Sequence, residues 1–264
     1  MAKTQKELAF LRDLYIQDVW TQRFTSLVDK HMDLSDSENM LYINAGTGGH
    51  ALGVKERFGE KTDIFASCEN DDLLVIARDK AAAIGADVDF STIRFEDDAF
   101  DAVLADASFV PPPELEEFIE NTIRVARTGG DVAIFLPSAG SFGEVFSLLW
   151  EALLNEQLTE YGAAVEGLIS GLPTVSRIED LAKTFGMVNI NTRMSTEQFE
   201  YKSGTDFVES PLVADFLMPA WLETLDENEQ ERIVKQLAQL IDAEEAPLSF
   251  VFTVKATLLT GEKG

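Results

Sequence analysis

The chain is poor in cysteine and histidine, and this scarcity excludes several kinds of disulfide and metal chemistry. Cys68 is the only cysteine, so neither an intrachain disulfide nor a cysteine-based metal cluster is possible. The two histidines lie far apart in the sequence and add no ligand cluster. We therefore expect no metal site.

Positive charge is also scarce. The chain has 21 Lys and Arg residues against 47 Asp and Glu residues, which gives a net charge of −26. Such a surface repels phosphate backbones and anionic lipid headgroups, so we expect neither nucleic acid nor a membrane as partner. A cationic ligand would be attracted, but solubility is the preferred explanation of a surface of this kind.

Long apolar runs are missing as well. The chain has no stretch of about 18 apolar residues, and its N-terminus, MAKTQKELAF, lacks the apolar core of a signal peptide. We therefore expect a cytoplasmic protein. With 264 residues, of which 45% are hydrophobic, the chain is long enough to fold around a full globular core.

The stretch around which the rest of the chain is organised is MLYINAGTGG, at residues 40–49. An apolar run passes into a glycine-rich loop, and a helical pattern follows directly over residues 50–58. This order is typical of nucleotide sites, because glycines let the backbone approach a ligand and the helix N-terminus offers unpaired N–H groups. A plain strand-to-helix turn has the same pattern, so the stretch alone leaves both interpretations open.

A second predicted strand, over residues 63–68, ends at Glu69 and Asn70. An acid about twenty residues after a glycine loop, at the tip of the second strand, suits hydrogen bonding to a ribose diol. The dinucleotide fingerprint G-x-G-x-x-G is incomplete, because Ala51 stands in place of its last glycine. A nicotinamide-dependent dehydrogenase is therefore disfavoured.

The glycine loop, within NAGTGGHAL, and the later stretch FEDDAFDAVLAD resemble motifs of the class I S-adenosylmethionine-dependent methyltransferases. The resemblance is clearest over residues 40–137 and weaker over residues 173–255. It implies S-adenosylmethionine as the cofactor and methyl transfer as the reaction.

The first half of the chain is predicted to alternate strand and helix after a long N-terminal helix over residues 4–31. Leu8, Leu11, Tyr15 and Val19 have the spacing of one apolar helix face. The later strands are predicted at residues 88–93, 100–105 and 131–137, and the later helices at 71–84, from Pro113 to a stop at Gly129–Gly130, and at 142–157. This alternation predicts a parallel sheet with right-handed crossovers.

The second half is predicted to complete the sheet around a helical insertion. Residues 161–172, rich in glycine, are interpreted as a loose connection. The elements predicted after it are a helix that ends at Phe185 with Gly186 as its cap, a strand at 187–201, helices at 210–225 and 229–243, and a strand at 248–259. The predicted fold is therefore an α/β, Rossmann-like, doubly wound, mostly parallel seven-stranded sheet with an antiparallel last strand.

We expect a single methyltransferase-like domain over residues 1–264. Its predicted parts are an N-terminal helical cover at 1–35, a cofactor-binding core at 40–137 and a helical insertion at 203–245, before the last strand.

The resemblance also indicates residues for the cofactor site, because open α/β sheets place their ligands at the carboxyl ends of the strands. The candidates are Asn44, Ala45, Gly46, Gly48, Cys68, Glu69, Asn70, Arg94, Phe95 and Asp106. No catalytic base is indicated, since methyl transfer needs a base only when the acceptor must lose a proton.

The sequence departs from the family's motifs in four places. The family's acid in the first strand falls on Tyr42, its first loop glycine on Asn44, and its ribose acid on Cys68, with Glu69 one place late. The acidic loop that holds the adenine amine is shortened before Phe95. Asn44 suits its place, because asparagine tolerates positive φ better than most residues.

Two functions follow from these observations. The first is an S-adenosylmethionine-dependent methyltransferase that transfers a methyl group to a small-molecule acceptor by in-line displacement. The second is a catalytically inactive relative that has lost cofactor binding and serves as a binding or assembly module. Neither the acceptor nor the oligomeric state can be read from the sequence.

Overall fold

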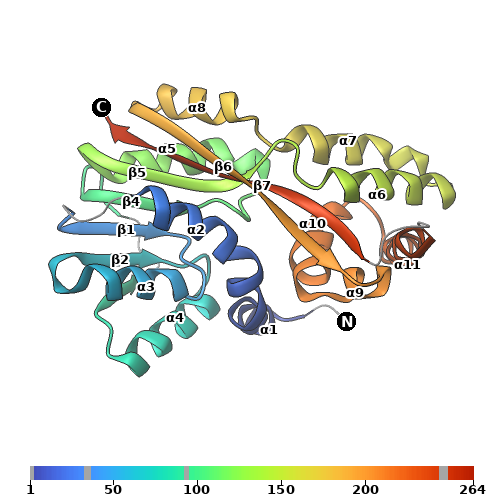
Figure 1. The fold of residues 1–264 in the computed structure, drawn as a ribbon, viewed down its shortest axis with the longest axis horizontal. Coiled ribbons are helices and arrows are strands. Elements are labelled where there is room, and N and C mark those ends of the chain that lie inside the picture. Colours follow the sequence, from blue (N-terminus) through green and yellow to red (C-terminus); the bar gives the residue numbers. More distant parts are fainter. Residues whose placement is uncertain (1–2, 33–36, 92–94, 244–248) are drawn as a thin grey trace. The chain divides into compact units, whose positions relative to one another are not determined.

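A computed structural model describes residues 3–32, 37–91, 95–243 and 249–264. Within these residues the chain forms one seven-stranded sheet with helices against it (Figure 1). The strands are β1 Asn39–Ile43, β2 Asp63–Ser67, β3 Val88–Ser91, β4 Phe100–Asp106, β5 Ala126–Ser138, β6 Met187–Tyr201 and β7 Phe250–Lys263.

Helical segments precede the sheet, connect its strands and interrupt its second half. Those up to β5 are α1 Gln5–Leu11, η1 Arg12–Thr21, α2 Gln22–His31, α3 Gly49–Phe58, η2 Gly59–Lys61, α4 Asp71–Ile84, η3 Pro112–Glu114 and α5 Leu115–Val125. Those after β5 are α6 Gly143–Asn155, η4 Thr159–Tyr161, α7 Gly162–Gly171, α8 Val175–Thr184, α9 Gly204–Glu209, η5 Leu212–Leu217, α10 Met218–Trp221 and α11 Glu227–Ala243.

The strand order is β3-β2-β1-β4-β5-β7-β6, so the chain reverses its direction of travel across the sheet after β3. Strands β1 to β5 pair in parallel, and the last strands are antiparallel. This result confirms the predicted fold class. The carboxyl ends of β1 and β4 lie side by side at the reversal, which is where open α/β sheets bind ligands.

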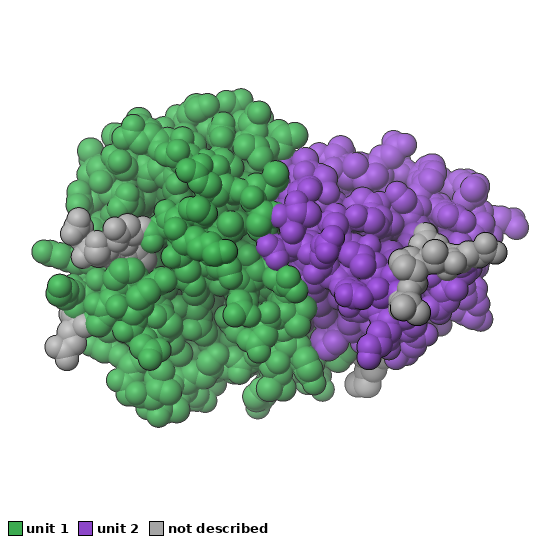
Figure 2. All heavy atoms as spheres, in the orientation of Figure 1, with its two compact units in different colours: residues 1–136, 174–195, 256–264 green, residues 137–173, 196–255 purple. Residues whose placement is uncertain are grey.

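By the density of its internal contacts the chain divides into two compact units, coloured in Figure 2. Unit 1 comprises residues 1–136, 174–195 and 256–264, and unit 2 comprises residues 137–173 and 196–255. The helical insertion expected at residues 203–245 falls within unit 2. The single domain expected over residues 1–264, with its core at residues 40–137, stays a prediction.

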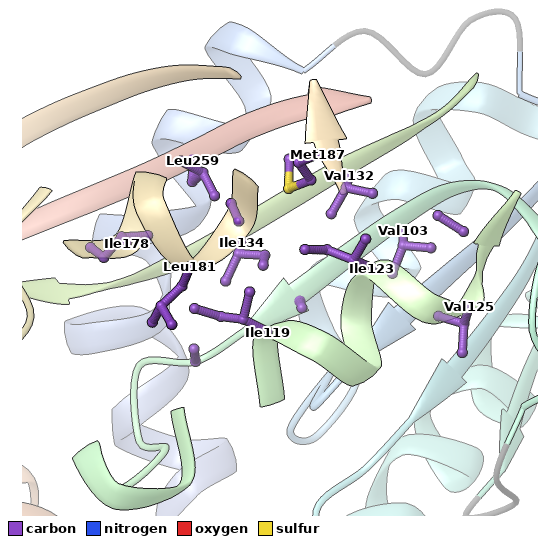
Figure 3. Close-up of a cluster of buried hydrophobic side chains, with 14 of the residues drawn as sticks. Val103, Ile119, Ile123, Val125, Val132, Ile134, Ile178, Leu181, Met187 and Leu259 are labelled. Atoms are coloured by element: carbon purple, nitrogen blue, oxygen red, sulfur yellow. The ribbon is translucent and has the colours of Figure 1, made fainter. Parts of the chain in front are cut away.

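The apolar core of unit 1 lies on both faces of the sheet. Ile119 and Ile123 of α5 and Ile178 of α8 pack on β1, β4 and β5 in one cluster of buried side chains (Figure 3). Phe135 alternates with Ile134 along β5, so it points to the other face, where Phe24 of α2 stacks on it at 5.9 Å between ring centroids.

Unit 2 has an aromatic core of its own. Trp221 of α10 packs on Phe142 and Phe146, and Phe252 of β7 stacks on Phe199 of β6 at 4.9 Å between ring centroids. Helix α11 packs against α6 and α9 in this unit.

The N-terminal helix forms as predicted, but its buried face differs from the predicted one. Tyr15 and Val19 are 48% and 41% exposed, whereas Arg12, Ile16 and Trp20 are buried. From Leu11 on, the predicted row has the same four-residue spacing as the buried one, so the buried face is the predicted one shifted by one residue along η1, a π-helix with i→i+5 hydrogen bonds.

Two predictions about glycines were wrong. Gly129 and Gly130 do not end a helix: α5 stops at Val125, and both glycines lie inside β5, next to an irregularity in its pairing with β4. The glycines of residues 161–172 do not form a loose connection either, because this segment is α7. A Cβ on Gly162 would lie 2.0 Å from the Trp150 ring, so this glycine permits close packing on α6.

Several other elements lie where they were predicted, although α9 was not predicted and the helix predicted over residues 210–225 is divided into η5 and α10. Helix α4 and strand β6 have the predicted bounds, and Gly85 and Gly186 follow their helices with φ of 67° and 93°, the left-handed conformation typical of a C-terminal cap. Across the ranges that the structure describes, no helix is both long enough and apolar enough to cross a membrane.

Gly130 provides a direct test of the β5 geometry. A Cβ at this position would lie 2.9–3.0 Å from the backbone oxygens of Arg127, Asp101 and Phe100, none of which can turn aside as a side chain would. We expect Gly130→Ala to lower the free energy of unfolding by about 1–3 kcal/mol in urea titrations. The control is Gly53→Ala in α3, where a Cβ meets open space and helix propensity predicts a gain of about 0.5–1 kcal/mol. Equal effects of both substitutions would contradict the assigned bulge.

Candidate functional site

The glycine loop (residues 44–49) joins β1 to α3 at the carboxyl edge of the sheet. Its backbone turns sharply: Asn44, Gly46 and Gly48 have φ of 57°, 58° and 76°. The left-handed conformation at Asn44 is the one expected there. The Ala45 N–H donates to the Ser67 carbonyl at 2.8 Å, which fixes the loop against the end of β2.

The glycines of this loop have different roles. A Cβ on Gly48 would lie 2.6 Å from the Phe90 ring and 3.0 Å from Ala77, so Gly48 lets the loop pack on β3 and α4. A Cβ on Gly46 would instead have the Arg12 side chain as its nearest neighbour, at 3.6 Å. The loop backbone at Gly46 is thus covered by a flexible side chain and not by the packed core.

Glu69, two residues after the end of β2, faces Gly46. One of its carboxylate oxygens accepts the Gly46 N–H at 3.1 Å, and the other lies 2.7 Å from Nη2 of Arg12. The carboxylate therefore reaches the loop although it stands one place later than the family's spacing. The Glu69 side chain remains 24% exposed, so it is accessible to a ligand.

Arg12 enters the same site from η1. Its guanidinium lies 4.0 Å from the Asp106 carboxylate and 4.6 Å from the centroid of the Phe109 ring, a cation–π distance. Its side chain is only 11% exposed. Arg12 was not among the residues predicted for the site. The one feature of the sequence that could have indicated its burial is its position on a helix, four residues before the apolar Ile16.

Asp106, the last residue of β4, closes the site. Burial raises the pKa of its carboxyl to about 6, although Arg12 and the hydrogen bond from the Ser108 N–H, at 2.7 Å, act in the opposite direction. The Asn44 side-chain amide donates to the Asp106 backbone carbonyl at 3.3 Å, so the glycine loop and the β4 terminus hold each other.

Aromatic side chains exclude water on one side of this charged group. Trp20 is fully buried, donates from Nε1 to the Ser108 hydroxyl at 3.1 Å, and packs 5.4 Å from Phe109 between ring centroids. Trp20 therefore belongs to the packed wall of the site and has no surface exposed to a ligand. Tyr15, on the same helical segment, is half exposed.

Of the other predicted site residues, some support the elements around the site and others lie away from it. Asn70 caps α4 by accepting the Leu73 N–H at 3.0 Å. Cys68 is buried, and burial, followed by the Glu69 charge, raises the pKa of its thiol to about 12, so it stays a neutral thiol. Phe95 packs on Phe100 and the α5-side core. Arg94 lies outside the described residues.

Thr47 is a further loop residue that sequence analysis did not select. It is 1% exposed, and its hydroxyl has no hydrogen-bond partner among the residues that the structure describes. Buried hydroxyl groups are normally hydrogen-bonded. An unpaired one in a glycine loop marks a place where a ligand would supply the missing partner.

The charges of this site do not cancel. Glu69 and Asp106 supply two carboxylates, whereas Arg12 supplies one guanidinium, and all three lie in unit 1. A pKa of about 6 leaves Asp106 mostly ionised at pH 7, so the site carries a net negative charge. It suits a ligand that combines a positive charge with hydroxyl groups for Glu69.

The raised pKa of Asp106 predicts a pH-dependent stability. Between its unfolded and folded pKa values, only the folded chain holds this proton, so the stabilisation is present at low pH and is lost as the pH rises through 6. Relative to Asp106→Asn, the wild type should lose about 1.4 kcal/mol of unfolding free energy between pH 5 and pH 7, measured by urea titration. A difference that does not change with pH would show that Asp106 titrates as an exposed carboxyl.

Comparison with known proteins places this geometry in a family. The model of the ubiE/COQ5 methyltransferase family matches residues 7–162, which is more than half of the chain and includes the whole charged site. Phosphoethanolamine N-methyltransferase 2 of Caenorhabditis elegans is 24% identical over 180 residues, 66% of this chain. The match spans only 38% of the length of that relative.

Two further similarities agree with this match. Demethylmenaquinone methyltransferase of Shouchella clausii is 20% identical over 184 residues, which is 63% of this chain and 77% of that protein. The structure of Haemonchus contortus phosphoethanolamine N-methyltransferase 2 with phosphomonomethylethanolamine and S-adenosylhomocysteine superposes with a TM-score of 0.56. At 16% identity, covering 98% of this chain and 58% of that one, it shows the shared fold.

These findings confirm the family resemblance and the cofactor that the sequence predicted. S-adenosylmethionine is the methyl donor that the family implies. The glycine loop, the β2 terminus and η1, which carries Arg12, all lie within the matched residues. The chain belongs to the ubiE/COQ5 methyltransferase family.

Proposed function

We propose that this protein is an S-adenosylmethionine-dependent methyltransferase that acts on a small-molecule acceptor. One observation carries the proposal: the Glu69 carboxylate holds the Gly46 N–H at the end of β1, beside the point where the sheet reverses its direction. The two curated relatives are named for phosphoethanolamine and for demethylmenaquinone, and both acceptors are small molecules. We include a cytoplasmic location, without nucleic acid or membrane partners, in this proposal.

The residues present fit the cofactor. Glu69 offers a partly exposed carboxylate to the ribose diol, and Gly46 would leave room for a ligand against the backbone once the Arg12 side chain moves. The unpaired hydroxyl of Thr47 lacks a partner that a bound ligand would provide. The excess of carboxylates over guanidinium complements a sulfonium cation, since charges interact strongly where water is excluded.

Each residue then has a definite task in the reaction. S-adenosylmethionine, when bound, supplies the methyl group for in-line displacement by the acceptor. Glu69 and Gly46 bind and orient the donor, Arg12 is placed to pair with a carboxylate, and Trp20 and Phe109 exclude water from that side. Alignment and water exclusion are what a displacement of this kind requires of a protein. No residue is assigned as a general base.

One observation favours the second candidate, an inactive methyltransferase-like module. The Arg12 guanidinium lies over Gly46 and already pairs with Glu69, so it occupies space and charge that the cofactor needs. An arginine side chain is flexible, and pairing with a ligand carboxylate would draw it away. Whether the ion pair yields to the cofactor therefore decides between the two candidates.

Calorimetric titration with S-adenosylhomocysteine and S-adenosylmethionine tests the proposal. We expect a dissociation constant below roughly 100 μM, or about 5.5 kcal/mol of binding free energy. Glu69→Gln should weaken binding about ten- to a hundredfold, because a charge-assisted hydrogen bond is lost. The control is Asp71→Asn, which changes the charge equally at an exposed position of α4. No heat with wild-type protein, together with an unchanged melting temperature, would instead support the inactive module.

A further inference from the structure

A second polar group lies next to the cofactor site and has no task in the function proposed above. The Tyr42 hydroxyl of β1 lies 3.1 Å from Nδ1 of His50 in α3, and Nε2 of His50 lies 3.2 Å from an Asp29 carboxylate oxygen in α2. Arg57 pairs with the same oxygen at 2.8 Å. The chain of contacts thus runs from a buried tyrosine to the protein surface.

Because Tyr42 and His50 are buried, losing any one of the three side chains would leave a polar group without its hydrogen-bond partner. Tyr42 is 1% exposed and the His50 side chain 9%, whereas the Asp29 side chain is 43% exposed. A hydroxyl and an imidazole in such surroundings need hydrogen-bond partners, and each supplies the other's. The Tyr42 and His50 rings also meet edge to face, with centroids 5.5 Å apart.

The Asp29 carboxylate decides the direction of the hydrogen bonds that link Asp29, His50 and Tyr42. An ionised Asp29 carboxylate only accepts, so the proton of its contact with His50 lies on Nε2. In the tautomer that carries only this proton, Nδ1 keeps a lone pair and accepts the Tyr42 O–H. Burial, followed by the nearby Asp106 and Glu69 carboxylates, raises the pKa of Tyr42, which keeps this proton in place and links the hydroxyl to the charges of the site.

Tyr42 and His50 lie on opposite sides of the glycine loop in the sequence. Tyr42 stands two residues before the glycine loop, at the end of β1, and His50 follows the loop directly, in the first turn of α3. Their hydrogen bond therefore joins the two stems of the loop. Asp29 ties this joint to α2, the continuation of the helical segment that carries Arg12.

We propose that Tyr42, His50 and Asp29 form a loop clasp, a set of positioning residues that hold the glycine loop in the conformation that receives the cofactor. The role in cofactor binding rests on the proposed function, whereas the effect on the loop itself does not. Tyr42 stands where the family's first motif has an acid, and the Asp29 carboxylate of α2 is linked to Tyr42 through His50.

Hydrogen exchange in the cofactor-free protein tests the clasp. We expect Tyr42→Phe to accelerate amide exchange of residues 44–49 about tenfold, while exchange in β4 and α5 stays as in the wild type. Asp29→Asn should have a smaller effect than Asp29→Ala, because the asparagine oxygen still accepts from Nε2–H. Tyr161→Phe and His31→Gln are matched controls at positions outside the loop. Unchanged loop exchange in Tyr42→Phe, or equal acceleration throughout unit 1, would overturn the proposal.

Calorimetry with S-adenosylhomocysteine adds the functional half of the test. Tyr42→Phe and Asp29→Ala should weaken binding about tenfold at 25 °C, and Asp29→Asn should restore most of the loss. A lower melting temperature with unchanged affinity would reduce the clasp to a structural contact and refute its positioning role. If the wild type itself binds no S-adenosylhomocysteine, the proposed function fails, and hydrogen exchange alone then decides whether the clasp positions the loop.

Discussion

The arrangement of two carboxylates around one guanidinium is the constraint on which this site depends. Glu69 and Asp106 come from the ends of β2 and β4, and Arg12 reaches both from the N-terminal helical segment. A buried arginine is tolerated only with partners, and the pKa of Asp106, about 6, shows how much the burial of the second acid costs. The site thus carries a net negative charge in surroundings that are partly shielded from water. These are the electrostatic conditions that favour binding of a cation.

Much of the fold could be predicted from the sequence because its signals are local. Apolar runs, helical spacing and glycine stops located the strands and most helices, and Asn44 took the positive φ that its place required. The predictions based on glycine were wrong where the glycine allows close packing with residues distant in the sequence. Gly130 lies against the backbone of β4 and Gly162 against Trp150, and neither neighbour is visible from the local pattern.

The site was predictable only in part, for a related reason. Gly46, Glu69 and Asp106 follow strands, so the rule that ligands bind at carboxyl ends of parallel strands located them. No such rule identifies Arg12 or Thr47. Placing Arg12 in the site requires knowing which helix face is buried, and placing Thr47 there requires knowing that its hydroxyl has no hydrogen-bond partner in the described residues. Phe95 follows a strand too, but it packs on Phe100 in the core of the opposite face.

The π-helical segment explains how one helical stretch serves both the core and the site. Arg12, Ile16, Trp20, Phe24 and Val28 are all buried, and each lies four residues after the last. In an α-helix of 3.6 residues per turn, a step of four overshoots one turn, so a row of this spacing winds steadily around the helix. In the wider π-helix the same step falls short of one turn.

Because η1 precedes α2, the two deviations have opposite signs and largely cancel. The row therefore stays on one side of the segment from Arg12 to Val28. Arg12 is thereby brought to Glu69 while Phe24 remains stacked on Phe135. An uninterrupted α-helix anchored by Phe24 would turn Arg12 away from the two acids, so the π-helix is the local structure that places this guanidinium beside them.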